Sequence, residues 1–135
     1  MYFCSMIQRK QTLYLLAAFV LQLLTALYAT QMQFINFQGL DAYSYHFVSA
    51  GLALLLLLII LLFKRRPLQC KLCLLALLVL IGLVVVTFFG VLSEGFVWQR
   101  ELLLGSDGLS IVCIVMAYLA IKKDEALVRS IDRIR

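Results

Sequence analysis

The stretch Lys64-Arg65-Arg66-Pro67-Leu68-Gln69-Cys70-Lys71, here called the basic hinge, separates two long apolar runs, residues 52–62 and residues 72–92. Four of its eight residues are cations, and cations are costly to carry across a bilayer and gather in cytoplasmic loops. The basic hinge is therefore predicted to lie on the cytoplasmic side, with a membrane hairpin on either side of it in the chain.

The composition is typical of a membrane protein and not of a soluble domain. Of its 135 residues 64% are hydrophobic and 14% are charged, with a mean hydropathy of +1.04, whereas soluble domains are about 45–50% apolar and about 25% charged. Backbone groups within hydrocarbon need internal partners, so only helices or closed barrels cross it. Long apolar runs without alternation favour helices. We therefore predict an all-α membrane protein with a single domain over residues 1–135.

Four apolar runs are candidates to cross a core about 30 Å thick. They cover residues 13–29, 47–63, 72–92 and 107–121, and nearly all Lys and Arg residues flank them. By the charge rule, the four transmembrane helices form two hairpins with both termini in the cytoplasm. The first run lacks the small-residue pattern of a cleavage site, so we expect it to be retained as a helix. Met1 and Met6 both stay open as the start.

The fourth run is the shortest, and Gly105-Ser106-Asp107-Gly108 precedes it. The glycines favour a break, and Ser106 or Asp107 can cap the next helix. We expect Asp107 to lie in a solvated outer loop with Glu94 and Glu101. A helix that starts near Leu102 is the alternative.

The other outer loop, residues 30–46, is rich in aromatic residues, among them Tyr43 and Tyr45. Aromatic rings at this depth usually form a belt at the membrane interface, where we also place His46. A surface that binds a partner or lipid is the alternative interpretation.

The tail, residues 122–135, differs from the rest of the chain. Leu127, Ile131 and Ile134 recur at helical spacing among charges, and Glu125 and Arg129 are spaced for an i,i+4 ion pair. We predict a cytoplasmic amphipathic helix that continues the fourth span.

The sequence contains no recognisable catalytic, cofactor-binding or metal-binding constellation. Cys70 and Cys73 lack the further ligands that zinc needs, and His46 is predicted on the opposite side of the membrane. The cations flank apolar runs, so anionic lipid headgroups are the expected partners and nucleic acid is not. Gln22 and Thr25 are the polar side chains deepest in the first run, and no ionisable residue is predicted inside a span, which argues against proton-coupled transport.

Three segments carry a resemblance: Met6-Ile7-Gln8-Arg9-Lys10-Gln11-Thr12-Leu13-Tyr14-Leu15-Leu16, Leu68-Gln69-Cys70-Lys71-Leu72-Cys73, and residues 120–135. Together they resemble the bacterial family catalogued as domain of unknown function 4293. The resemblance implies a four-helix integral membrane protein with no assigned activity, which we expect in the bacterial inner membrane.

The family-like polar residues gather at the cytoplasmic ends, where Arg9 and Lys10 are spaced to pair with Asp124 and Glu125 and close the bundle. The candidate interaction residues are Arg9, Lys10, Gln11, Asp124, Glu125, Arg129 and Arg133.

By elimination we expect a non-catalytic accessory or assembly subunit of a larger inner-membrane complex, which binds a membrane-protein partner or forms a homo-oligomer. The alternatives are a minimal transporter or channel that acts as an oligomer, with Gln22 and Thr25 lining its path, and a lipid-binding envelope factor.

Overall fold

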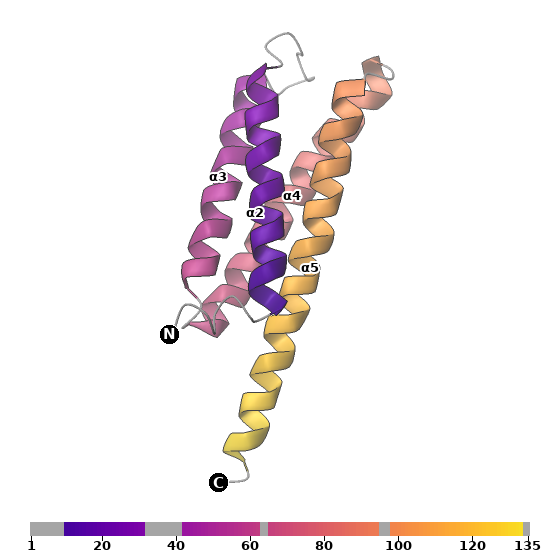
Figure 1. The fold of residues 1–135 in the computed structure, drawn as a ribbon. Helices are drawn as coiled ribbons and strands as arrows, with labels where there is room; N and C mark the ends of the chain where they lie inside the picture. The colour runs from indigo at the N-terminus through magenta and orange to yellow at the C-terminus, as the bar shows by residue number, and fades with distance from the viewer. Residues whose placement is uncertain (1–9, 32–41, 63–64, 95–97, 134–135) are drawn as a thin grey trace.

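The chain folds into a bundle of long helices that run alternately up and down (Figure 1). The computed structural model describes residues 10–31, 42–62, 65–94 and 98–133. Its helices are α2 (Lys10–Gln31), α3 (Ala42–Leu61), α4 (Arg66–Glu94) and α5 (Trp98–Asp132). All four are long and apolar enough to cross a membrane, which confirms the all-helical fold class and its four candidate spans.

Each helix packs against two neighbours. In the described residues α2 contacts α3 and α5, and α4 contacts α3 and α5, whereas neither α2 and α4 nor α3 and α5 have backbones in contact. The helices therefore occupy the corners of a square, with the two hairpins side by side. Side chains that meet across a diagonal of this square lie in the centre of the bundle.

Most of the buried residues follow a regular pattern, with intervals of four and three residues in alternation, and Ala26 and Ala53 are buried outside it. The pattern comprises residues 11, 15, 18, 22, 25 and 29 of α2, residues 45, 49, 52, 56 and 59 of α3, residues 69, 73, 76, 80, 83, 87 and 90 of α4, and residues 103, 107, 110, 114, 117 and 121 of α5. A seven-residue repeat keeps one seam of each helix against its partners, as in coiled coils and four-helix bundles. We call these positions the core seams.

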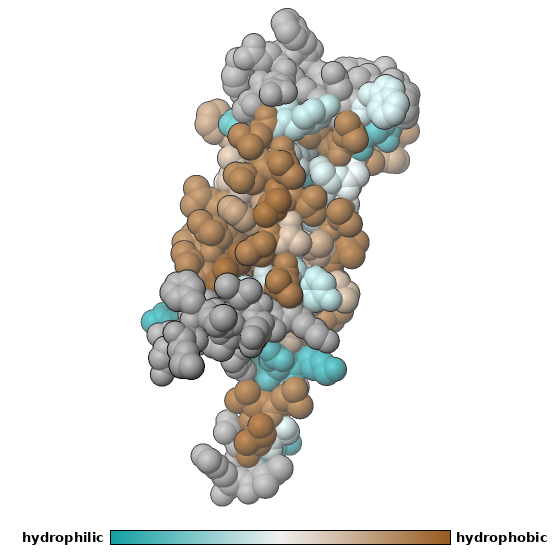
Figure 2. All heavy atoms as spheres, in the orientation of Figure 1, coloured by the Kyte–Doolittle hydropathy of each residue, from teal (hydrophilic) through white to brown (hydrophobic). Residues whose placement is uncertain are grey.

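The polarity of the bundle is arranged as for lipid. The core seams hold Gln22, Thr25, Thr87, Asp107 and further polar residues, while many leucines and phenylalanines are more than 40% exposed. Figure 2 shows apolar side chains over the middle of the visible face and hydrophilic ones near both ends. Lipid solvates exposed leucine at no cost, so the polar residues are left to pair inside the bundle.

The helices extend beyond the predicted spans. The predicted start of α3 at residue 47 is wrong, because α3 begins at Ala42 and includes Tyr45 and His46. The predicted cap and break at residues 105–108 are also wrong, because α5 is continuous through both glycines. Ser106 and Ser110 donate hydrogen bonds to carbonyl groups of α5 itself. A broken helix would leave backbone groups unpaired among apolar side chains, which costs more than the weak helix propensity of glycine.

The last part of α5 projects past the other helices (Figure 1). Ile121 is its last fully buried residue, and Leu127, Val128 and Ile131 are 43–60% exposed. The tail thus continues the fourth helix without a bend, and its Ile134 lies outside the described residues.

Candidate functional site in the bundle core

Asp107 is the centre of the candidate site. It lies nine residues after the first residue of α5, which at about 1.5 Å per residue is about 14 Å along the helix. The residue is 0% exposed. The prediction that Asp107 caps a helix in a solvated loop is therefore wrong, and so is the prediction that every span lacks an ionisable residue.

Two side chains from other helices donate hydrogen bonds to the Asp107 carboxylate. The amide Nε2 of Gln22 in α2 donates to Oδ1 at 2.9 Å, and the hydroxyl of Tyr45 in α3 donates to Oδ2 at 2.5 Å. Thr87 of α4 lies within hydrogen-bonding reach of the Tyr45 hydroxyl. Each helix thus contributes one residue to a polar layer, here called the Asp107 layer, in which the Tyr45–Asp107 hydrogen bond spans the diagonal between α3 and α5.

The hydroxyl groups around this layer donate their hydrogens elsewhere. Thr87 donates to the Leu83 carbonyl at 2.7 Å, and Ser110 donates to the Ser106 carbonyl at 2.9 Å. The other amide atom of Gln22, Oε1, is buried and has no hydrogen-bond partner in the part of the chain that the structure describes. The centre of the bundle therefore holds more hydrogen-bond acceptors than donors.

Among the described residues, Asp107 has no cationic side chain as an ion-pair partner. His46, the neighbour of Tyr45, instead has its Nδ1 2.9 Å from the carbonyl oxygen of Ala26. A buried carboxylate is costly to keep charged without a counter-ion. A bound proton or a small cation would neutralise this carboxylate.

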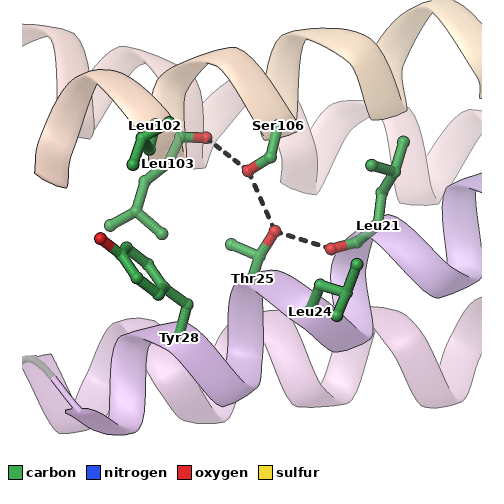
Figure 3. A pocket seen from close by; sticks show the side chains of 7 residues that line it. All are labelled: Leu21, Leu24, Thr25, Tyr28, Leu102, Leu103 and Ser106. Atoms are coloured by element: carbon green, nitrogen blue, oxygen red, sulfur yellow. Dashed lines mark hydrogen bonds between the residues drawn. The ribbon is translucent and has the colours of Figure 1, made fainter.

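A second link between α2 and α5 lies beside the Gln22–Asp107 hydrogen bond. The hydroxyl oxygens of Thr25 and Ser106 are 3.0 Å apart, and these residues are three positions after Gln22 and one position before Asp107. They line a groove of about 280 Å³ between the two helices (Figure 3). The groove is otherwise lined by Leu21, Leu24, Tyr28, Leu102 and Leu103.

The structure brings some of the sequence-predicted candidates together and separates others. Gln22 and Thr25 both lie in the core, next to the site. Gln11 is buried at the other end of α2, with Oε1 unpaired among the described residues. Glu125 forms the expected i,i+4 ion pair with Arg129, at 2.6 Å.

The predicted closing pairs of Arg9 and Lys10 are not described. Arg9 and the side chain of Lys10 lie outside the described residues. Asp124 is half-buried and Arg133 is exposed, both on the projecting end of the chain.

Sequence reasoning missed Tyr45 and Asp107. Tyr45 was placed in an interfacial belt, yet it is 1% exposed in the core. The sequence does contain a signal, because polar and small residues recur along the core seams at intervals of three, four or seven residues, for example Asp107, Ser110 and Ala117 in α5. In an apolar helix, small and polar residues mark the face that contacts other helices.

Comparisons with known proteins identify the family alone. The family model "Domain of unknown function (DUF4293)" matches residues 7–134. Neither the comparison with curated proteins nor that with solved structures found a match. With nearly its whole length covered by that model, the chain belongs to the DUF4293 family.

Proposed function

We propose that this chain is a multi-pass protein of the bacterial inner membrane, with both termini inside, that binds a proton at Asp107 and couples its release to the movement of a solute. It acts as a minimal transporter and carries out no covalent chemistry. The observation that carries the proposal is a fully buried carboxylate, inside a helix able to span a membrane, held by two donors from two other helices. Ionisable residues in such positions commonly form proton relays.

The pairing of Asp107 with Gln22 suits both protonation states. A charged carboxylate accepts a hydrogen bond from Nε2, as observed at 2.9 Å. A protonated carboxyl can donate one to Oε1, which is unpaired among the described residues, after rotation of the amide group alone. Proton uptake and release then need no helix to move, while the Tyr45 hydroxyl holds the other oxygen in place.

Infrared spectroscopy of the reconstituted protein tests proton binding directly. We expect the difference spectrum between acidic and alkaline buffer to contain the band of a protonated carboxyl group, which Asp107→Asn removes. Glu101→Gln is the matched control, because Glu101 is a partly exposed acid on the same helix. An identical spectrum for wild type and Asp107→Asn contradicts the proposal.

A second candidate, the accessory subunit, is favoured by the projecting end of α5. Its exposed Leu127, Val128 and Ile131 form an apolar strip next to Lys122 and Lys123, beyond the last buried residue of the helix. Such a strip suits a helix of a partner or the membrane surface.

Affinity purification in mild detergent tests this candidate. A stoichiometric partner that is lost on truncation after Ile121 supports a subunit role. A homo-oligomer of unchanged size and composition after truncation excludes it.

A further inference from the structure

The groove between α2 and α5 opens on the outer surface of the bundle. Leu24 and Leu102 form its rim and are 57% and 54% exposed, whereas Leu103 and Thr25 at its floor are 1% and 3% exposed. Figure 3 shows the Thr25 and Ser106 hydroxyls turned toward one another between the apolar walls. The rim belongs to two candidate spans, so with both helices in a bilayer the groove would open toward lipid.

The floor of this groove has more hydrogen-bond acceptors than donor hydrogens. Thr25 Oγ1 lies 2.8 Å from the Leu21 carbonyl, Ser106 Oγ lies 2.9 Å from the Leu103 carbonyl, and the two hydroxyl oxygens are 3.0 Å apart. These three oxygen–oxygen contacts share two hydroxyl hydrogens, so one contact contains none. Each hydroxyl oxygen has two lone pairs, and most of the four are unfilled. The floor therefore accepts a donor and offers no free hydrogen to an acceptor.

The carboxyl group of Asp107 belongs to the link next to this floor. Asp107 follows Ser106 in α5, and Gln22, its partner, lies one turn before Thr25 in α2. The Gln22–Asp107 and Thr25–Ser106 links are adjacent rungs between the same two helices. When Asp107 is ionised, its carboxylate therefore attracts a cation at the neighbouring floor, in a medium that screens charge poorly.

We propose that the groove binds an amphipathic amine in its ammonium form, taken up from the membrane. Its N–H groups donate to Thr25 Oγ1 and Ser106 Oγ, and its apolar part packs against the groove leucines. This inference rests on the proposed function, since the ammonium and the proton on Asp107 neutralise the same charge and so bind in alternation.

The volume and the chemistry of the groove restrict its occupant. About 280 Å³ lies just below the range of about 300–1,000 Å³ for ligand pockets, which favours a small amine over a large drug-like molecule. A lipid acyl chain or a leucine from a second copy fits the walls but brings no donor to the floor. These occupants are the alternatives that the experiment must separate.

The experiment measures binding of 9-aminoacridine, a fluorescent amphipathic amine, to the full chain in nanodiscs of zwitterionic lipid. Empty nanodiscs correct for partitioning. We expect saturable binding that falls at least tenfold in Leu24→Trp, which fills the groove from its rim, and in Thr25→Val, which removes one acceptor at constant shape. Leu23→Trp is the matched control, since Leu23 is exposed on α2 and does not line the groove.

Each outcome decides between the occupants. No saturable binding to wild type, or equal binding to Leu24→Trp and wild type, overturns the proposal. Displacement by decanol as readily as by dodecylamine at equal membrane concentration also overturns it, because a pocket for lipid chains ignores the ammonium group. If Leu24→Trp fails to fold, judged by its elution profile, the near-isosteric Thr25→Val decides alone.

Proton release separates this proposal from the proposed function. In weakly buffered solution, 9-aminoacridine is expected to release a proton from wild type and none from Asp107→Asn. If 9-aminoacridine binds without proton release, the groove is an amine site but proton coupling at Asp107 is refuted. If Asp107 titrates but 9-aminoacridine does not bind, the proton site is supported and amine binding in the groove is refuted.

Discussion

Removal of the Tyr45 hydroxyl tests the Asp107 layer as a source of stability. The hydroxyl of this 1% exposed side chain donates to Asp107 Oδ2 at 2.5 Å, across the diagonal between α3 and α5. Hydrogen bonds to charged groups contribute about 1.5–3 kcal/mol in soluble proteins, and side-chain bonds within membrane bundles average about 0.6, with a maximum of about 1.7 kcal/mol. Lipid tails do not compete with Asp107 for the Tyr45 hydroxyl as water would. The unfolded chain in a membrane, however, also finds hydrogen-bond partners for this hydroxyl, which reduces the net contribution of the bond.

For Tyr45→Phe we therefore expect a loss of about 1.5 kcal/mol in the free energy of unfolding, near the top of the membrane range because the acceptor is ionisable. This loss corresponds to about a twelvefold change in the unfolding equilibrium constant. The assay is reversible unfolding in mixed micelles, titrated with a denaturing detergent and followed by circular dichroism. Tyr118→Phe is the control, since Tyr118 is a half-buried tyrosine of α5 outside the layer.

A double-mutant cycle with Asp107→Leu assigns the loss to this one bond. If the bond carries the effect, Tyr45→Phe costs little when Asp107 is already replaced, and the coupling energy is about 1 kcal/mol or more. Additivity of the two changes within about 0.5 kcal/mol would refute the reasoning, because residues that share no interaction behave in that way.

Two further predictions concern the ends of the bundle. Arg129→Ala breaks the exposed 2.6 Å ion pair with Glu125. Because solvent screens such pairs, we expect the free energy of unfolding to fall by less than about 0.5 kcal/mol in the same assay. A loss above about 1 kcal/mol would point to a further contact of Arg129. In a variant that keeps Cys70 as its one cysteine, an impermeant maleimide added outside intact cells is expected to leave the thiol unlabelled. A cysteine at Ser44, on the exposed start of α3 at the other end of the bundle, is expected to react. Labelling of Cys70 would reverse the proposed topology.

The four helices follow from local properties of the chain. Insertion into a bilayer depends on hydropathy summed over about twenty residues, so the apolar runs at residues 13–29, 47–63 and 72–92 each lie largely within a helix of the structure. The helices extend a few residues further because a chain within hydrocarbon keeps its backbone hydrogen bonds for as long as it can.

The fourth helix shows where local reasoning failed. Gly105 and Gly108 around Ser106 and Asp107 have the composition of a turn, and in water that interpretation would be favoured. In the bundle, Asp107 bonds to Gln22 and Tyr45, so its side chain is not available as a cap. The glycines stay helical since a break would leave backbone groups unpaired among apolar side chains.

A candidate residue was predictable only where a polar side chain differs from its apolar neighbours in sequence. Gln22 and Thr25 stand out because leucines surround them, whereas Tyr45 and Asp107 lie at the edges of apolar runs, where polar residues are ordinary. Their role depends on contacts across 62 and 85 positions of sequence, which no window along the chain contains.

The amino-acid sequence alone determined that this protein has four apolar runs able to form membrane-spanning helices, because the preference of each segment for lipid is a sum over its own residues. Only the tertiary structure decided which face of each helix is buried and that Asp107 meets Gln22 and Tyr45 in the centre. In lipid both faces of an apolar helix are equally well solvated. The choice between faces therefore rests on how small and polar side chains from all four helices fit one another.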